Sequence, residues 1–181
     1  MNIKEKLLAI GRDFSERVYS SPVTVDGPLY RVGASFRSHL QLASDDGLVT
    51  NPPMDIFTKL KWYETGETMI VSYGAAFDKG QQNGDFLHRR DGARLSFTVQ
   101  LDMVGNSDKL LTAVSYRFHL RFLPGSVPEY LRFDLGRPHS NPIAEPRFHA
   151  HVGTKGLRIP TPALSPLEAL AFALHCDESE T

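Results

Sequence analysis

The sequence predicts an α+β fold, in which helices from both ends of the chain cover one face of a curved, mostly antiparallel sheet of about six to eight strands. Three observations support this class. Segments in which apolar and polar residues alternate fall together in the middle of the chain, instead of alternating with helices. Helical patterns flank them at 1–19 and 165–176, with the sheet expected between 28 and 158. The 181 residues and 41% hydrophobic content suit a single domain, 1–181.

The first elements follow from the spacing of apolar residues. In 1–19 they recur every three or four positions, as in an amphipathic helix: Ile3, Leu7, Ile10, Phe14 and Val18. Between Tyr30 and Phe36, apolar residues alternate with polar residues and glycine, which predicts the first strand. Residues 44–55 are expected to be a loop from their Asp, Gly, Asn and Pro content. Turn residues from Glu64 to Glu67 then separate two strand-like runs, 57–63 and 68–77, and predict a hairpin.

A polar, glycine-rich segment at 78–94 is expected to be a loop. It contains a cluster of basic side chains that either binds an anion or is simply solvated: His88, Arg89, Arg90 and Arg94. Two clear strands follow at 95–102 and 115–122, where strict alternation favours antiparallel strands with one buried face.

The C-terminal part combines short strands with histidines. Apolar and polar residues alternate at 129–135 and again at 147–152, and a proline-rich connection joins the two runs. The last helix, 165–176, is expected to begin with a capping box in which Ser165 and Glu168 exchange hydrogen bonds.

The polar positions of three of these strands carry the candidate site. If 115–122, 129–135 and 147–152 lie side by side, they gather seven side chains on one face: Arg117, His119, Arg121, Arg132, Asp134, His149 and His151. Imidazoles titrate near neutrality and move protons, while guanidiniums hold phosphate. We expect His149 and His151 as catalytic proton carriers, Asp134 as the carboxylate that orients an imidazole, and Arg132, Arg117, Arg121 and His119 as phosphate contacts.

Two alternatives remain for the same histidines. Residues two apart on a strand project from one face, so His149 and His151 with His139 or Asp134 would supply three ligands for zinc, manganese or iron. In the other alternative the histidines are structural, partnered by Asp134 or by backbone groups. Among the three possibilities, we expect the acid–base site described above, without a metal or a cofactor.

Charge and composition narrow the function further. The formal net charge is -1, but residues 117–158 carry 7 basic and 3 acidic side chains, a balance of +4, whereas residues 159–181 carry 4 acidic and no basic ones. A positive block can bind phosphate or acidic protein, and it also occurs on ordinary solvated faces. The single cysteine, Cys176, excludes an intrachain disulfide. No signal-like N-terminus or membrane-length apolar run is present, which predicts a cytoplasmic protein without membrane contact.

The order of features in 112–174 resembles the TumE-like bacterial toxin family. The matching pieces are Arg132-Phe133-Asp134 for the family's YDN strand, His139 in the following loop, and His149-Ala150-His151-Val152-Gly153 for its HxHxG-like segment. Leu135 stands where the family has Asn, and residues 1–111 precede the matched part. The resemblance implies a prokaryotic toxin–antitoxin or phage-defence setting, with action on RNA or translation.

Together these features predict a toxin-like or phage-defence-associated prokaryotic protein that acts on nucleic acid, with metal-independent ribonuclease activity as the candidate reaction. The alternative is a non-catalytic module that binds a partner or assembles a toxin–antitoxin or defence system. The first function would make the chain an enzyme, a ribonuclease-like hydrolase, and the second would not. Expected partners are RNA or another nucleic acid, and a protein that is either an antitoxin or a defence-system subunit.

Overall fold

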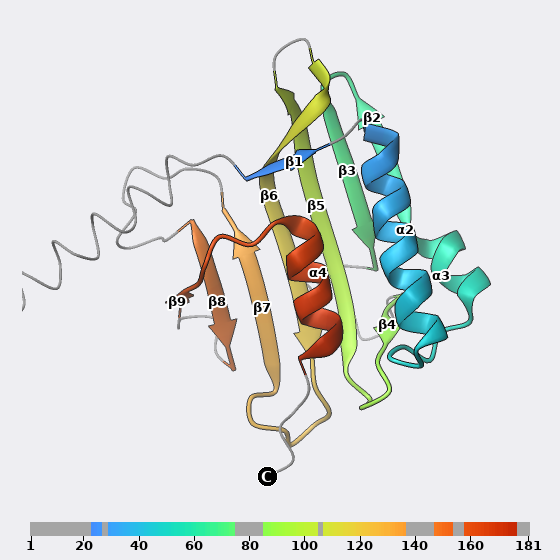
Figure 1. Ribbon diagram of the computed structural model, residues 1–181. Helices are drawn as coiled ribbons and strands as arrows, with labels where there is room; N and C mark the ends of the chain where they lie inside the picture. The colour runs from blue at the N-terminus through green and yellow to red at the C-terminus, as the bar shows by residue number, and fades with distance from the viewer. Residues whose placement is uncertain are drawn as a thin grey trace, which may run out of the picture.

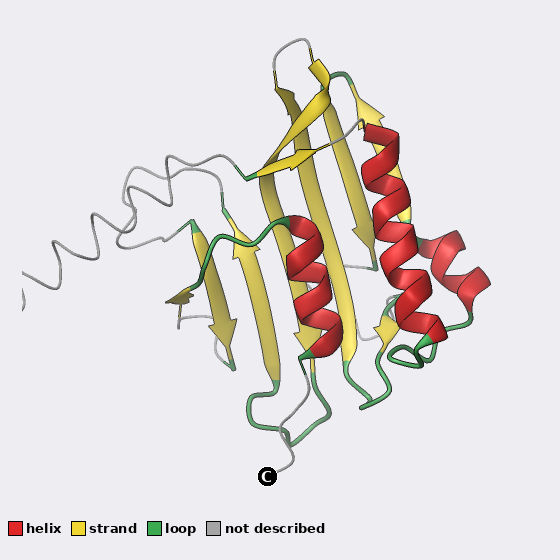
Figure 2. Ribbon diagram, in the orientation of Figure 1, coloured by secondary structure: helices red, strands yellow, loops and turns green. Residues whose placement is uncertain are grey.

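The computed structural model describes residues 23–26, 29–74, 85–104, 107–136, 147–153 and 158–176. Nine strands and three helices lie within these ranges, and all the pairings between these strands are antiparallel. The chain therefore has an α+β fold built on an antiparallel sheet, which confirms the predicted class (Figures 1 and 2).

Seven of the described strands form one continuous order, β2-β3-β5-β6-β7-β8-β9, while β1 pairs with β6 and β4 with β5. Their bounds are β1 Thr24–Asp26, β2 Lys61–Thr65, β3 Thr68–Tyr73, β4 Leu87–His88, β5 Arg94–Val104, β6 Ser107–Arg121, β7 Tyr130–Leu135, β8 Phe148–Val152 and β9 Arg158–Pro160. The β2-β3 hairpin turns at Gly66, whose φ of 61° is a left-handed conformation that glycine adopts readily. Most neighbours in the sheet are also consecutive in the chain, since antiparallel strands need only short connections.

The described helices are α2 (Leu29–Asp45), α3 (Pro53–Lys59) and α4 (Pro166–His175). Helices α2 and α4 cover the same face of the sheet (Figure 1). Phe36 of α2 stacks on Phe97 of β5 with ring centroids 5.6 Å apart, and Phe97 stacks on Phe118 of β6 at 5.3 Å. The core therefore lies between the helices and one sheet face. Neither α2, α3 nor α4 combines the length and hydrophobicity of a membrane span.

The strand predicted from Tyr30 to Phe36 is wrong, because this segment is the first half of α2. Val32, Phe36 and Leu40 recur every four residues and are 2%, 0% and 0% exposed, whereas Tyr30 is 68% exposed. Positions 32 and 36 fit both a period of two and a helical spacing of four, so a short alternating run does not separate the two structures. The sheet consequently does not occupy the chain from 28 onward, and after β1 its next strand begins at Lys61.

The other strands predicted within the described residues are present, but α3 was not predicted. It begins inside the loop predicted at 44–55, and its last residues, 57–59, belong to the run predicted as the first strand of the hairpin. The predicted hairpin is β2 and β3, and the strands predicted at 95–102, 115–122, 129–135 and 147–152 are β5, β6, β7 and β8. At the start of α4, the Glu168 N–H donates to Ser165 Oγ at 3.2 Å and the Ser165 N–H donates to Glu168 Oε2 at 2.7 Å, which is the expected capping box. The helix predicted at 1–19 lies outside the described residues.

Candidate functional site

The three strands that carry the predicted site are neighbours in the sheet, in the order β6-β7-β8, as expected. Their register aligns two rows of polar side chains: Arg117, Asp134 and His149 in one row, and His119, Arg132 and His151 in the next. The residues between them along each strand lie in the core. Because side chains alternate along a strand, both rows project from the face opposite the helices.

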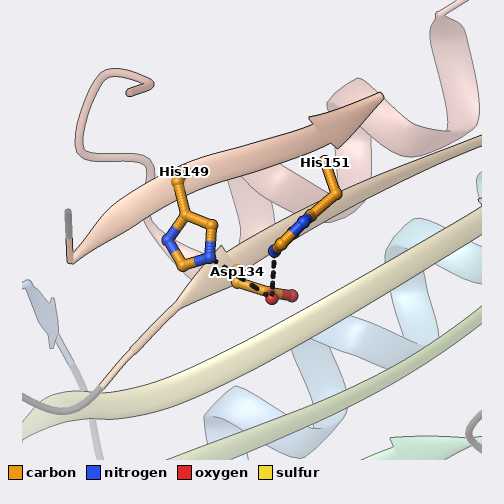
Figure 3. Close-up of side chains that lie close together, drawn as sticks. All are labelled: Asp134, His149 and His151. Atoms are coloured by element: carbon orange, nitrogen blue, oxygen red, sulfur yellow. Dashed lines mark ion pairs between the residues drawn. The ribbon is translucent and has the colours of Figure 1, made fainter. Parts of the chain in front are cut away.

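Asp134 is the centre of what we call the polar cluster, which consists of Asp134, Arg117, Arg132, His149 and His151. Asp134 Oδ2 lies 2.7 Å from Arg132 Nη2, 3.5 Å from His151 Nε2 and 3.6 Å from His149 Nε2. Its other oxygen, Oδ1, lies 3.8 Å from Arg117 Nε. Figure 3 shows both imidazoles reaching from β8 toward the carboxylate of β7. One carboxylate thus contacts two imidazoles and two guanidiniums.

Arg132 determines the protonation state of one imidazole. Its Nη2 lies 2.8 Å from His151 Nε2 and 2.7 Å from Asp134 Oδ2. A guanidinium nitrogen can only donate, so His151 Nε2 must accept and therefore carries no proton in this arrangement. His151 is consequently a neutral imidazole here, with its Nε2 lone pair held by Arg132.

The polar cluster is buried at its centre and accessible at one side. Asp134 and His149 are each 8% exposed and His151 is 1% exposed, whereas the side chain of Arg117 is 46% exposed. Next to Arg117, a shallow depression is lined by Gly74, Ser96, Phe97, Thr98, Arg117 and His119. Asp134 Oδ1 is buried and accepts no hydrogen bond among the described residues. A buried acceptor normally has a donor, so a ligand that supplied one would approach from the Arg117 side.

The carboxylate also acts on Tyr116, which faces the core from β6. Burial, followed by the negative charge of Asp134, raises the pKa of Tyr116 above its usual range. The Tyr116 hydroxyl donates to the backbone oxygen of Leu164 at 3.1 Å and so joins β6 to the segment before α4. Tyr116 therefore stays neutral and structural.

The same side chains have the composition of a metal site. One ligand atom from each of Asp134, His149 and His151 lies within 4.8 Å of the others. The oxygen-to-nitrogen distances of 3.5 and 3.6 Å exceed those of good hydrogen bonds and approach the roughly 3.4 Å edge of a zinc tetrahedron. However, Arg132 Nη2 already contacts two of the three acceptors, so a metal would have to displace the guanidinium. His139, the other ligand considered, lies outside the described residues.

Two predicted phosphate contacts lie on β6 beyond the direct contacts of Asp134. His119 is 8% exposed and faces Arg132 across the strands. Arg121 pairs with Tyr130 and is four residues from Arg117, a distance of roughly 13 Å along the strand. Arg121 shares the polar face with the cluster but does not reach it.

Arg94 belongs to this face as well, and the sequence interpretation placed it in the wrong element. It begins β5 and pairs with Arg121 of β6. The alternation of Arg94, Ser96 and Thr98 with buried residues continues the pattern of β5 and was the available signal. The loop predicted at 78–94 is therefore wrong at Leu87–His88, which form β4, and at Arg94, which begins β5.

Of the other three residues in the predicted basic cluster, Arg89 is not available to an anion. Arg89 is 3% exposed, and its guanidinium donates to the Asp91 carboxylate at 2.6 Å. It also donates to the backbone oxygens of Ala173 at 2.7 Å and Cys176 at 2.6 Å, at the end of α4. Those oxygens lack partners within the helix, so Arg89 serves as a C-terminal cap. Its role is structural.

The two pieces on which the family resemblance depends meet in space, because the RFD segment belongs to β7 and the HAHVG segment begins in β8, and these strands pair. Asp134 and His149 are directly opposite each other in that pairing. The polar cluster is therefore built mainly from the residues of those two pieces. In comparisons with known proteins, no family model, no curated protein and no solved structure matches this chain.

Proposed function

We propose that this chain is a toxin-like or phage-defence-associated prokaryotic protein that cleaves RNA without a metal. The proposal depends on one observation: two imidazoles and two guanidiniums surround a single buried carboxylate on adjacent strands. Histidines, arginines and a carboxylate are the groups that acid–base cleavage of a phosphodiester requires. The TumE-like resemblance of 132–153 supports the same setting. A cytoplasmic location and a protein partner, either an antitoxin or a defence-system subunit, belong to this proposal.

The distances support a division of roles within the cluster. His149 Nε2 lies 3.6 Å from the Asp134 carboxylate, which would orient this imidazole to donate a proton to the leaving 5′-oxygen. His151 is neutral, and its Nε2 is held by Arg132. A substrate phosphate that attracts Arg132 would release this nitrogen, which could then remove the proton of the attacking 2′-hydroxyl. Arg117, at the accessible side, would bind the same phosphate.

The position of Arg132 supports a reaction that does not use a metal. It supplies a positive charge between two of the acceptors that would otherwise attract a cation. Phosphate charge would be neutralised by Arg117 and Arg132 instead of by an ion.

Cleavage of single-stranded RNA by the purified full chain in EDTA tests the proposal. His149→Ala and Asp134→Asn should each lower the rate at least a hundredfold, since acid–base catalysis contributes about 10²–10⁴-fold. His175→Ala is the matched control, because His175 is exposed in the last turn of α4. When expressed in cells, the wild type and the His175→Ala control should inhibit growth, and the His149→Ala and Asp134→Asn variants should not. If a folded His149→Ala protein retains full cleavage and full toxicity, the proposed site is wrong.

The second candidate, a non-catalytic module that binds a partner, is favoured by the burial of His151 at 1% and His149 at 8% exposure. In that case the polar cluster would organise the sheet and would not meet a substrate. His151→Ala should then lower the melting temperature without changing any activity on RNA. Co-purification of the wild-type chain with a stoichiometric protein partner, together with no RNA cleavage at any concentration, would decide for this candidate.

A further inference from the structure

A second group of arginines lies on the same sheet face, where β5 begins and β6 ends. Arg94 and Arg121 are directly opposite each other across these two strands. Arg121 is exposed and Arg94 is partly buried. On this face Asp134 forms ion pairs with Arg117 and Arg132, and among the described residues neither Arg94 nor Arg121 pairs with it. Two guanidiniums therefore stand side by side without a carboxylate between them in the described part of the chain.

This arrangement is unfavourable for the protein alone. Like charges directly opposite each other on antiparallel strands, with Cβ atoms about 5 Å apart, repel and destabilise the sheet. An anion between Arg94 and Arg121 would replace the repulsion with charge-assisted hydrogen bonds, which are about twice as strong as neutral ones. The pair thus has the charge of an anion-binding site and contributes nothing favourable to folding in the absence of an anion.

The spacing along β6 indicates what kind of anion fits. Arg121 is roughly 13 Å from Arg117 along the strand, with His119 between them on the same face. Strand side chains stand roughly perpendicular to the sheet, so these guanidiniums contact different anionic groups. A free mononucleotide cannot occupy both positions, whereas a polymer with successive phosphates can. Because Asp134 and His149 are recessed, a flexible single strand can bend toward them and a rigid duplex cannot.

We infer that Arg94 and Arg121 form a phosphate subsite for a single-stranded oligonucleotide, whose backbone runs along β6 to Arg117 and the polar cluster. This subsite depends on the proposed function, for which it would make single-stranded nucleic acid the ligand. Positive grooves that track the backbone are the usual way in which proteins bind single strands without sequence preference. The shallow depression beside Arg117 and His119 lies along this path.

Fluorescence anisotropy of the full chain with a labelled single-stranded DNA of about 12 nucleotides tests the subsite, at a length within the usual site size. DNA lacks the 2′-hydroxyl, so binding is measured without cleavage. The Arg94→Gln/Arg121→Gln double variant should bind about a hundredfold more weakly at low salt, with a salt slope reduced by about 1.4. Arg31→Gln/Arg90→Gln is the matched control, since it removes the same charge from two exposed residues of other segments. It should weaken binding less than about twofold. The melting temperature of the Arg94/Arg121 variant should equal or exceed that of the wild type, because a repulsive pair is removed.

The outcomes separate the subsite from the proposed reaction. Equal weakening by the two double variants would mean that only overall charge matters, and the subsite would be overturned. Polyglutamate that binds more tightly than DNA of equal charge would overturn the nucleic-acid ligand in favour of an acidic protein. Binding that depends on Arg94 and Arg121 while RNA is never cleaved would keep the subsite and remove the ribonuclease. Cleaved RNA with DNA binding unchanged in the Arg94/Arg121 variant would remove the subsite alone.

Discussion

Replacing Arg132 by Met tests how the polar cluster is held together. The guanidinium contacts the carboxylate of Asp134 at 2.7 Å and Nε2 of His151 at 2.8 Å, with the side chains of Arg132 and Asp134 only 15% and 9% exposed. Removing one partner of a buried pair leaves an uncompensated charge, which costs about 3–5 kcal/mol. The 15% exposure of Arg132 lets water reach the remaining groups, so we expect the lower end, about 3 kcal/mol. For a chain of this size that is a fall in melting temperature of about 6–12 °C.

Urea denaturation of Arg132→Met, Asp134→Asn and the double variant measures this effect as a double-mutant cycle. The double variant should be less destabilised than the sum of the single ones, because neutralising Asp134 removes the charge that the first change leaves unpaired. Arg31→Met, in an exposed position of α2, is the control and should change the free energy of unfolding by less than about 0.5 kcal/mol. If Arg132→Met lies within about 1 kcal/mol of wild type and the cycle is additive, the buried pair does not exist as described.

Zinc added to the same proteins distinguishes the metal alternative. Wild type should gain no thermal stability, because Arg132 occupies the acceptors of Asp134 and His151. Arg132→Met should gain stability with zinc, by about 2.7 kcal/mol at a concentration of a hundred times Kd, and should lose this gain when His149 is also changed to Ala. Zinc stabilisation of the wild type that disappears in His149→Ala would instead identify a metal site and end the proposal of metal independence.

Two further predictions concern α4. Arg89→Met should destabilise the chain by about 3 kcal/mol in urea denaturation, because it removes the ion pair with Asp91 and the donor to the backbone oxygens of Ala173 and Cys176. Arg90→Met, at an exposed position, should have little effect, and equal stability of the two variants would contradict the cap. Hydrogen bonds from the backbone N–H of Ser165, and then from its side chain, lower the pKa of Glu168. The stability that the Glu168 carboxylate contributes is therefore fully present above its unfolded pKa of about 4.3. This stability is lost as the pH falls through the lower pKa of the folded state. Wild type should therefore be more stable than Glu168→Gln at pH 7, with the difference vanishing in melts at acidic pH, and a difference that persisted at low pH would exclude the carboxylate as its cause.

The polar face could be predicted because a period of two assigns each strand residue to a face without knowledge of the partner strand. Once β6, β7 and β8 are recognised as strands, Arg117, Asp134 and His149 must lie on the side opposite Phe118 and Phe133. Sequential antiparallel strands also tend to pair with each other, which made the adjacency of the three strands a reasonable expectation.

Other features depend on contacts that no local pattern encodes. The bond from Arg89 to Ala173 joins residues 84 positions apart, and nothing near Arg89 in the sequence distinguishes it from the exposed Arg90. The bridging position of Arg132 depends on the rotamer that packing allows, so the neutral state of His151 could not be deduced from the sequence. The helix at Leu29–Asp45 was missed because the interpretation stopped at Phe36, although Leu40 and Ala43 continue its buried stripe.

Successive residues of β6 lie on opposite faces of the sheet. Tyr116, Phe118 and Leu120 are 5%, 0% and 1% exposed on the helix side, while the residues between them belong to the polar face. A substitution at an odd-numbered position from 117 to 121 therefore changes the polar face, whereas one at an even-numbered position changes the hydrophobic core. Sequence change on the polar face can thus leave the residues that pack against the helices unchanged. Similarity in this segment is then best judged separately for the two sets of alternate positions.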